Sequence, residues 1–478
     1  MTTQVQEAPV AVPEGCELRF VDPATPVDNP ANGRTDKQRT AWAKSIAALG
    51  VLEPLLAYER EDGALVLIAG ECRKYSAIAA GLTSVPVYVR NDMSDAMRLA
   101  GIIGENRNRE GLRPVVEARI IQEMFDLPGM TEQEVSALTG IKRPELREAR
   151  RVMGSEAAAA IAERHNLTMF RGAVLAEFED TREALKLLTV TAVKRPEDWD
   201  HKVANARRDR AEREAREAVA RSITDSGAAL VDENEVPVSS LWLDELPAPK
   251  GRKTFTEATH RGCPGHFGAV VEDYDSRTYV AIYGCLDPVE HGHLTALSEA
   301  QPAAEPPADV PPRGMSEEAK AALARTKRNN KEWVTATTVR LRYVAQLLAG
   351  KKVPKGTLRF VAEVVVLHPT TLGKGYDSHL ARALGKGDES ARTPGRAADA
   401  LIENTADPQL PLALLAQVAA SVEGTDDRKD GWRRHGPCLI PYLDFLATTG
   451  YALSRVEREV MGLPAEDELA DLELAEAA

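Results

Sequence analysis

The fold of the N-terminal domain is decided by residues 64–79, ALVLIAGECRKYSAIA, in which an apolar run gives way to helical spacing at Gly70. The run Ala64–Ala69 is short and apolar at every position, which favours a buried β-strand. Apolar residues then recur at helical spacing between residues 75 and 82. The stretch therefore predicts a strand that is followed directly by a helix.

Short apolar runs lie on both sides of this stretch. Leu55–Tyr58 precedes it and is separated from it by the turn-forming sequence Glu59–Gly63, which predicts a hairpin. Val85–Val89 follows it and predicts another short strand. Because helical spacing also occurs before the hairpin, we expect a small α/β domain between about Leu18 and Arg90.

The whole chain has 478 residues, of which 43% are hydrophobic and 28% are charged. This length suits about two to four domains with buried cores. The net charge of −13 excludes a uniformly basic surface but not local basic patches. No apolar run approaches the ~20 residues needed to cross a bilayer, and five cysteines do not make a disulfide framework. The first residues lack an export signal, so we expect a cytoplasmic protein without membrane contact.

Ala, Arg, Glu and Leu dominate most of the chain, which favours helix. We predict an α+β protein that is mostly helical. The expected segments are a disordered tail (1–16), the α/β domain (17–110), a helical domain (111–195), a charged helical connector (196–235), a small β module of zinc type (236–295), a proline-rich linker (296–315), a helical C-terminal domain (316–463) and an acidic tail (464–478).

Two segments contain the residue types of a nucleotide site. Gly70–Tyr75 lies where the strand meets the helix, and a glycine there lets backbone N–H groups approach a phosphate. Arg73 and Lys74 add cations for phosphate oxygens. Gly104–Glu110 offers carboxylate, amide and guanidinium groups. Either segment alone is also typical of a helix cap and a solvated face.

In this order the segments resemble the ParB family of chromosome and plasmid partition proteins, over about residues 17–155. Asn29–Arg34 (NPANGR) is similar to the family's Asn-Pro-x-x-x-Arg segment, and Gly50–Leu55 (GVLEPL) is similar to its Gly-x-x-x-Pro element. Gly70–Arg73 (GECR) lies where the family has Gly-Glu-Arg-Arg. Glu105–Ala118 is close to the family's second box.

The resemblance implies a domain that binds CTP with Mg²⁺ and closes a dimer into a clamp on DNA. The implied nucleotide-binding residues are Asn29, Arg34, Gly70, Glu71, Arg73, Asn106 and Arg109. Glu71 and Glu105 are the implied residues for positioning the metal and water in catalysis. Cys72 and Tyr75 replace basic residues of the family, and each loss removes a phosphate contact of about 1.5–3 kcal/mol. CTP binding is expected, whereas a weak CTPase activity stays open.

Cys72 allows another interpretation, because Gly70–Ala77 also resembles the active-site stretch of sulfiredoxin, which shares the ParB superfamily fold. A cysteine at a helix N-terminus beside Arg73 and Lys74 is expected to have a lowered pKa and to act as a nucleophile. The structural alternative is a small, half-buried residue that fills the space of the missing arginine. The second box has no place in a sulfiredoxin, which favours the structural alternative.

Residues 130–146, MTEQEVSALTGIKRPEL, predict a helix-turn-helix. Thr131 and Glu134 have the spacing of a capping box. Gly140 suits the turn, and the second helix is expected to begin near Arg143 or Pro144. An ordinary short helix pair is the alternative, but the position directly behind the ParB-like segments favours DNA binding. The cations expected to contact DNA are Lys142, Arg143, Arg147, Arg150 and Arg151.

Cysteines and histidines gather between His260 and His293. The spacing Cys-x-x-His is typical of tetrahedral zinc. A strand pair over Val270–Ile282 would bring Cys285 back beside this Cys-x-x-His element. A short β element without metal is the alternative. The pattern also resembles an element of actinobacterial ParB-like proteins. We predict a structural zinc site with the ligands Cys263, His266, Cys285 and either His291 or His293.

The stretch Arg313–Arg359 has 12 basic and three acidic residues, which is a local charge of +9. Such a stretch is expected to bind the DNA backbone with strong salt dependence. A solvated face, or neutralisation by the acidic tail, is the alternative. Apolar residues at helical spacing predict that the stretch also packs or dimerises: Trp333, Val339, Leu341, Val344, Leu347 and Leu348.

The sequence therefore predicts a DNA-binding, ParB-like protein that acts as a CTP-responsive dimeric clamp in plasmid, phage or chromosome partition, or in transcriptional regulation. Its expected partners are DNA, a second copy of the chain and a ParA-type ATPase, with nucleoid or plasmid association. One alternative is an enzyme on the same fold, a nuclease or phosphotransferase that uses Cys72, Glu71 and Glu105. The other is a sequence-specific repressor whose nucleotide site has decayed, which the residue at position 72 supports.

Overall fold

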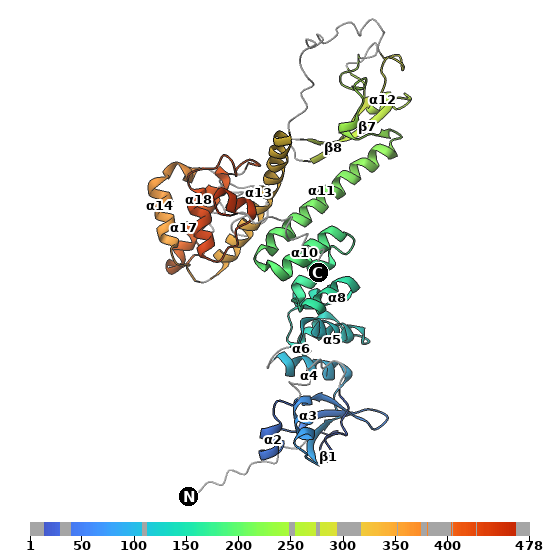
Figure 1. The fold of residues 1–478 in the computed structure, drawn as a ribbon, viewed down its shortest axis with the longest axis vertical. Helices are drawn as coiled ribbons and strands as arrows, with labels where there is room; N and C mark the ends of the chain where they lie inside the picture. The colour runs from blue at the N-terminus through green and yellow to red at the C-terminus, as the bar shows by residue number, and fades with distance from the viewer. Residues whose placement is uncertain are drawn as a thin grey trace. The chain divides into compact units, whose positions relative to one another are not determined.

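In the computed structural model the described residues fall into two compact units, the first ending at Pro196 and the second beginning at Glu197 (Figure 1). The predicted proline-rich linker and most of the predicted N-terminal and acidic tails lie outside the described residues. No described helix combines the length and the apolar composition needed to cross a membrane. The structure describes residues 14–28, 40–107, 112–247, 254–273, 278–293, 317–350, 352–373, 380, 403, 405–426 and 428–464.

The first unit begins with a four-stranded sheet in the order β1-β4-β2-β3. Strands β2 and β4 are parallel, whereas the other neighbours are antiparallel. The hairpin and the third strand of the sequence prediction are confirmed, whereas β1 was not predicted, although its sequence CELRFV alternates between apolar and charged residues over its first five positions. The elements are β1 (Cys16–Val21), α2 (Ala43–Leu49), β2 (Leu55–Glu59), β3 (Leu65–Ala69), α3 (Glu71–Ala79) and β4 (Val85–Arg90).

Strand β3 is buried at all five positions because both of its faces are covered. Leu65 and Leu67 belong to the core that the sheet forms with α2 and α3. Ile68 belongs instead to the core of the following helices. A Cβ added to Gly101 would lie 3.3 Å from the side chain of Ile68, so the first of these helices approaches the strand closely. The strand therefore joins the α/β part of the unit to its helical part.

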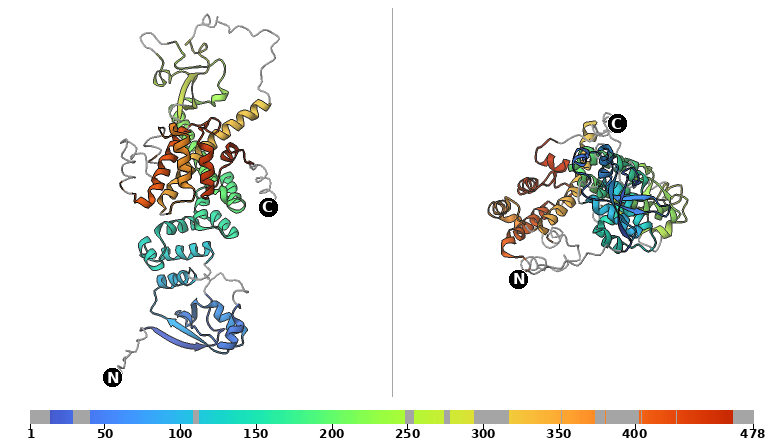
Figure 2. Two further views of the ribbon diagram at one scale, coloured as in Figure 1. Left: turned by 90° about the vertical axis from the view of Figure 1, so that its left-hand side faces the viewer. Right: turned by 90° about the horizontal axis from the view of Figure 1, so that it is seen from below.

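The helical part continues from the sheet and is coloured light blue to green in Figure 2. The predicted capping box is confirmed: Glu134 N donates to Thr131 Oγ1, and Thr131 N donates to the Glu134 carboxylate. Gly140 has a φ of 71°, which glycine adopts without strain, and the next helix begins at Arg143 as predicted. The helices are α4 (Asp95–Arg107), α5 (Pro114–Asp126), α6 (Glu132–Thr139), α7 (Arg143–Met153), α8 (Glu156–His165), α9 (Met169–Ala176) and α10 (Arg182–Lys194).

The second unit begins with the long charged helix α11 (Trp199–Asp225), in the region where the sequence predicts one. A small sheet in the order β5-β7-β8-β6 packs against it. Gly268 lies at the contact, since a Cβ there would be 2.6 Å from the side chain of Ile223. The predicted strand pair is confirmed as the hairpin β7–β8. The elements are β5 (Ala229–Leu230), β6 (Leu241–Trp242), α12 (Glu257–His260), β7 (His266–Asp273) and β8 (Thr278–Cys285).

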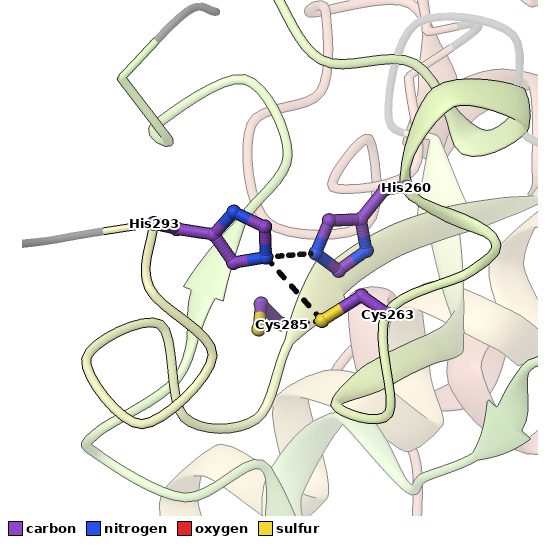
Figure 3. A group of neighbouring side chains, drawn as sticks. All are labelled: His260, Cys263, Cys285 and His293. Atoms are coloured by element: carbon purple, nitrogen blue, oxygen red, sulfur yellow. Dashed lines mark hydrogen bonds between the residues drawn. The ribbon is translucent and has the colours of Figure 1, made fainter.

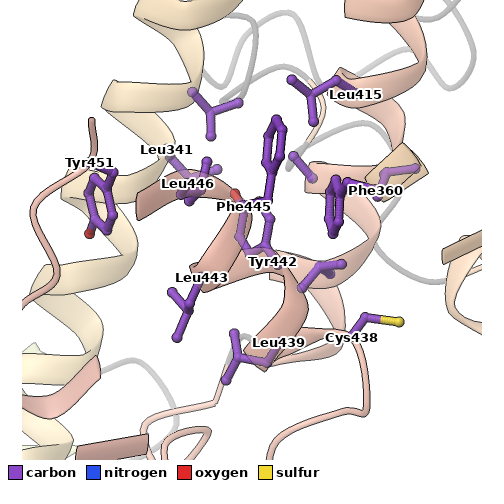
Figure 4. Close-up of a cluster of buried hydrophobic side chains, with 14 of the residues drawn as sticks. Leu341, Phe360, Leu415, Cys438, Leu439, Tyr442, Leu443, Phe445, Leu446 and Tyr451 are labelled. Carbon is purple, nitrogen blue, oxygen red and sulfur yellow. The ribbon is translucent and has the colours of Figure 1, made fainter. Parts of the chain in front are cut away.

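The rest of the second unit is a helical domain around one large apolar core (Figure 4). The predicted stripe on α13 packs into this core: Trp333, Val339, Leu341 and Val344 are buried, and Leu347 and Leu348 lie against it. Phe360 and Phe445 stack with ring centroids 4.8 Å apart. The helices are α13 (Glu317–Ala349), α14 (Thr357–Leu367), α17 (Leu410–Thr425), α18 (Leu439–Thr448) and α19 (Arg455–Val460).

The basic stretch on α13 is partly neutralised inside this unit. Arg340 is fully buried, donates twice to the Glu423 carboxylate at 2.8 and 2.9 Å, and donates to Glu457 at 2.6 Å. Arg325 pairs with Glu459, and Lys331 pairs with Glu212 of α11. Carboxylates within the described part of this unit are therefore partners of these three cations.

We predict that Arg340→Ala lowers the free energy of unfolding of the second unit by about 3–5 kcal/mol, because two buried carboxylates would lose their counter-charge. Urea unfolding followed by tryptophan fluorescence measures this, since the Arg340 guanidinium lies 4.5 Å from the Trp333 ring. The matched control is Arg359→Ala, whose side chain is 85% exposed and whose pair with Glu363 is open to solvent. Equal effects of the two substitutions on the free energy of unfolding would contradict the stabilising role of the buried Arg340 ion pairs.

Candidate functional site

The junction between β3 and α3 is fixed by Gly70. This residue has a φ of 108° and precedes the first helical residue, Glu71. A Cβ at position 70 would lie 3.2 Å from Leu55 Cγ and 3.3 Å from its Cα, so both the backbone conformation and the space require glycine. The N-terminus of α3 is thereby held against the start of β2, with its backbone N–H groups at the predicted phosphate position.

Arg73 connects α3 to the segment that leads into β2. One guanidinium nitrogen donates to the carbonyl oxygens of Glu53 and Pro54, at 2.8 and 2.6 Å. The side chain is 9% exposed. In this structure Arg73 therefore holds the Gly50–Leu55 element in place, and phosphate binding by its remaining donors stays a prediction.

Lys74 and Tyr75 both bind Asp28. Lys74 Nζ lies 2.7 Å from Asp28 Oδ1, and the Tyr75 hydroxyl donates to Asp28 Oδ2. Lys74 is nearly buried, so its charge depends on this carboxylate. Asp28 immediately precedes the predicted nucleotide-binding residues Asn29 and Arg34, which lie outside the described residues.

Glu71 and Cys72 are buried, with 3% and 6% of their surface exposed. Burial of the Cys72 thiol supports the structural alternative, in which cysteine fills space in the core, because a nucleophile has to be reached by its substrate. Burial of the Glu71 carboxylate places an acceptor for a metal or for water beside the helix N-terminus.

The second predicted segment lies at the end of α4. Asn106 is buried and donates from Nδ2 to the carbonyl oxygen of Ile102 at 2.8 Å. Glu105 is half-buried, and Arg109 lies outside the described residues. Arg107 reaches two later helices: its Nε donates to Glu117 on α5 at 2.5 Å, and another nitrogen donates to Glu145 on α7 at 3.3 Å.

The five predicted DNA-binding cations are all exposed on or beside α7. Arg147 pairs with Glu132 at 3.1 Å, and its hydrogen bond lowers the pKa of Glu132. Arg151 pairs with Glu177, and Arg150 lies 4.7 Å from the ring of Phe125. Among the described residues, neither Lys142 nor Arg143 has an ion-pair partner, so the beginning of α7 presents cations to solvent.

Four cysteine and histidine side chains converge in the β module of the second unit (Figure 3). One ligand atom from each of His260, Cys263, Cys285 and His293 lies within 4.8 Å of the others. Burial lowers the pKa of His260 to about 4 and raises the pKa of Cys285 to about 12. The group contains His260 in place of the predicted His266, and of the two histidines that the sequence left open it contains His293.

Comparisons with known proteins find similarity in the N-terminal part of the chain. A family model described as "ParB N-terminal domain" matches residues 24–107. A probable chromosome-partitioning protein ParB of Treponema pallidum is 35% identical over 139 residues, which are 28% of this chain and 43% of that protein. The chromosome-partitioning protein Spo0J of Thermus thermophilus is 40% identical over 111 residues, which are 23% of this chain and 40% of that protein.

This chain is similar to the ParB family over its N-terminal domain, residues 24–107. It spans less than half the length of these curated relatives. The structure of C-terminally truncated ParB from Caulobacter crescentus complexed to the centromeric parS site matches 38% of this chain and 96% of that chain, with 22% identity and a TM-score of 0.29. The structure complexed with CTP-gamma-S matches 36% and 97%, with 24% identity and a TM-score of 0.18.

Three contacts around these sites were not predicted. Asp28 holds the ParB N-terminal domain's Lys74 and Tyr75, Arg107 connects three helices, and His260 joins the Cys/His group. The basic residue at position 74 indicates the need for an acidic partner, but not which one. The sequence His260-x-x-Cys263 is as regular as the Cys-x-x-His spacing and was the available signal for His260.

We predict that Asp28→Ala destabilises the ParB N-terminal domain by about 1–3 kcal/mol, because Lys74 would be left nearly buried without its counter-charge. Thermal unfolding of the two proteins measures the difference. Asp62→Ala is the control, since its pair with Arg60 is exposed and solvent replaces the partner. An effect of Asp28→Ala no larger than that of the control would contradict the role of Asp28.

Proposed function

We propose that this protein binds DNA through the helix pair α6–α7, binds CTP with Mg²⁺ through its ParB N-terminal domain, and acts in partition as a homodimeric clamp. The carrying observation is that Arg107 connects the second nucleotide-site segment to the helix that would read DNA. The names of the curated relatives support a role in chromosome partition. Transcriptional regulation is the second role that the same machinery would serve.

The residues of the ParB N-terminal domain suit the binding of a nucleotide with Mg²⁺. Gly70 packs closely against Leu55 and has no Cβ. The backbone N–H groups at the N-terminus of α3 therefore suit the binding of a phosphate group. Glu71 and Glu105 are the carboxylates that would hold Mg²⁺ or its water, and the ion would neutralise phosphate charge. Asn106, with Asn29, Arg34, Arg73 and Arg109, would complete the contacts. Cys72 supplies no cation for the phosphates. We therefore expect CTP to be bound but to be hydrolysed only weakly.

The DNA site would use the exposed cations of α7 in two ways. Lys142 and Arg143 lie at the N-terminal end of the helix, which is the end that reaches base edges in a helix-turn-helix. Arg147, Arg150 and Arg151 are further along the helix and would contact phosphates. The pair between Arg147 and Glu132 is exposed, so DNA phosphates compete with the carboxylate at small cost.

Arg107 connects the predicted nucleotide site at the end of α4 to the predicted DNA-binding helix α7. Its position follows Glu105 and Asn106, and its side chain contacts Glu145 in the first turn of α7. A nucleotide that moves the end of α4 therefore changes the position of α7 through this contact. We propose this coupling as the basis of CTP responsiveness, with a ParA-type ATPase as a further partner at the nucleoid or on a plasmid.

Two alternatives differ in the nucleotide site. A repressor with a decayed site would bind DNA and no nucleotide, which the residue at position 72 favours. An enzyme that uses Cys72 as nucleophile would need access to a thiol that is 6% exposed. The burial makes the repressor the stronger of the two alternatives.

We predict that Arg143→Ala weakens binding to the preferred DNA sequence by about 1–3 kcal/mol, because a base or phosphate contact is lost. Fluorescence anisotropy with genomic fragments selected for binding measures the affinity. The control is Arg210→Ala on α11, which removes an exposed pair with Glu214 in the other unit. Unchanged affinity of the Arg143 variant would contradict DNA reading by α7.

We also predict that Arg107→Ala reduces the effect of DNA on CTP affinity, since the route to Glu145 would be cut. Coupling free energies of this kind are about 1–3 kcal/mol, and most of this is expected to disappear. The measurement compares CTP affinity with and without bound DNA. Arg119→Ala, which breaks an exposed pair with Glu163 on α8, should keep the coupling. Full coupling in the Arg107 variant would overturn this route.

A further inference from the structure

We propose that His260, Cys263, Cys285 and His293 bind one zinc ion that has a structural role in the β module. The four side chains come from the open end of the β7–β8 hairpin, where β7 begins and β8 ends, and point toward a common centre (Figure 3). His260 ends α12, and Cys263 lies in the turn that follows. Cys285 ends β8, and His293 lies in the turn after it.

Three distances between the ligand atoms are close to those of a tetrahedral zinc site, and all the ligand atoms lie within 4.8 Å of one another. The two sulfurs are 3.8 Å apart, the Nε2 atoms of His260 and His293 are 3.0 Å apart, and His293 Nε2 lies 3.3 Å from Cys263 Sγ. Zinc bond lengths and a tetrahedral angle give roughly 3.8 Å between two sulfurs, roughly 3.3 Å between two nitrogens and roughly 3.6 Å between nitrogen and sulfur. The sulfur separation also excludes a disulfide in this arrangement, since a bonded pair is about 2 Å apart.

Neighbouring residues hold the two ligand-bearing turns together. The N–H of Leu286 donates to the carbonyl oxygen of Gly265 at 2.9 Å, which joins the turn after Cys263 to the chain after Cys285. A Cβ at Gly265 would lie 2.4 Å from the His291 ring and 3.0 Å from Cys285 Sγ, so the close approach requires glycine. The edge of the Phe255 ring covers His260 and His293, with centroid distances of 5.7 and 5.2 Å.

His266 acts one step away from the ion. Its Nδ1 lies 3.0 Å from Nδ1 of His260, whose other nitrogen faces the ligand group. Its ring stacks on Tyr283, at 5.4 Å and 12°. A histidine that binds zinc through Nε2 commonly has its Nδ1 proton held by a second group, and this contact orients the ring. The structure therefore assigns His266 to positioning His260.

The site has the features of a structural and not of a catalytic zinc. Four protein ligands leave no position for water or substrate. The apolar core next to the group is small, with only Leu243, Leu246 and Cys285 buried in it among the described residues. A bound metal would add to the folding free energy of a module of this size.

The test is the zinc content of the full-length protein, purified without chelator and measured by inductively coupled plasma mass spectrometry. We expect one zinc per chain in the unaltered protein, and less than a tenth of this in His293→Gln and Cys263→Ser. His291→Gln is the matched control for His293→Gln and should retain one zinc. Loss of zinc from the His291 variant with retention in the His293 variant would overturn the ligand set.

A second measurement tests the proposal even where a ligand variant fails to fold. Co²⁺ added to the metal-free full-length protein should give the absorption of a tetrahedral site with thiolate ligands. His266→Gln should keep the stoichiometry and bind the metal 10- to 100-fold more weakly, which is the usual effect of losing such a contact. A protein that takes up neither metal, or that has Cys263 and Cys285 joined as a disulfide after purification under reducing conditions, would overturn the proposal. Neither measurement involves CTP or DNA, so its outcome is independent of the proposed function.

Discussion

Burial of β3 on both faces is the constraint on which the first unit depends. Leu65 and Leu67 pack into the sheet core, and Ile68 packs into the helical core that contains α4 to α7. Because one short strand belongs to both cores, the position of Gly70 after it is fixed relative to the helices as well as to the sheet. The predicted phosphate position at α3 and the candidate DNA-reading helix thus belong to one packed unit, and Arg107 adds a polar contact between its parts.

The sequence predicted the elements that local patterns specify, including the β2–β3 hairpin, the α6–α7 pair and the β7–β8 hairpin. It did not predict contacts between residues that are distant in the chain. Lys74 and Tyr75 share Asp28 across more than forty positions, and no periodicity reports such a pairing. The Cys/His group contains His260 and not the expected His266, because the ring of His266 at the start of β7 stacks on Tyr283, a contact that depends on the strand register.

In the second unit, the pattern of charged residues in the sequence likewise did not predict which cations are buried. The basic stretch on α13 is visible as an excess of cations, but a sequence does not distinguish Arg340, which is fully buried between two carboxylates, from Arg359, which is exposed. The buried arginine fixes how α13, α17 and α19 meet. A small β module with four convergent cysteine and histidine side chains belongs to the same unit, and a metal ion bound there would stabilise it.

Equilibrium binding of radiolabelled CTP to the intact protein tests the central claim most directly. Unlabelled ATP and GTP serve as competitors, and the measurement is made with and without Mg²⁺ and with random or genomic DNA fragments. The account predicts Mg²⁺-dependent CTP binding that ATP and GTP do not displace and that becomes tighter with one particular DNA fragment. Binding of DNA without any nucleotide would contradict the clamp and leave a repressor, and preference for ATP would instead indicate an enzyme.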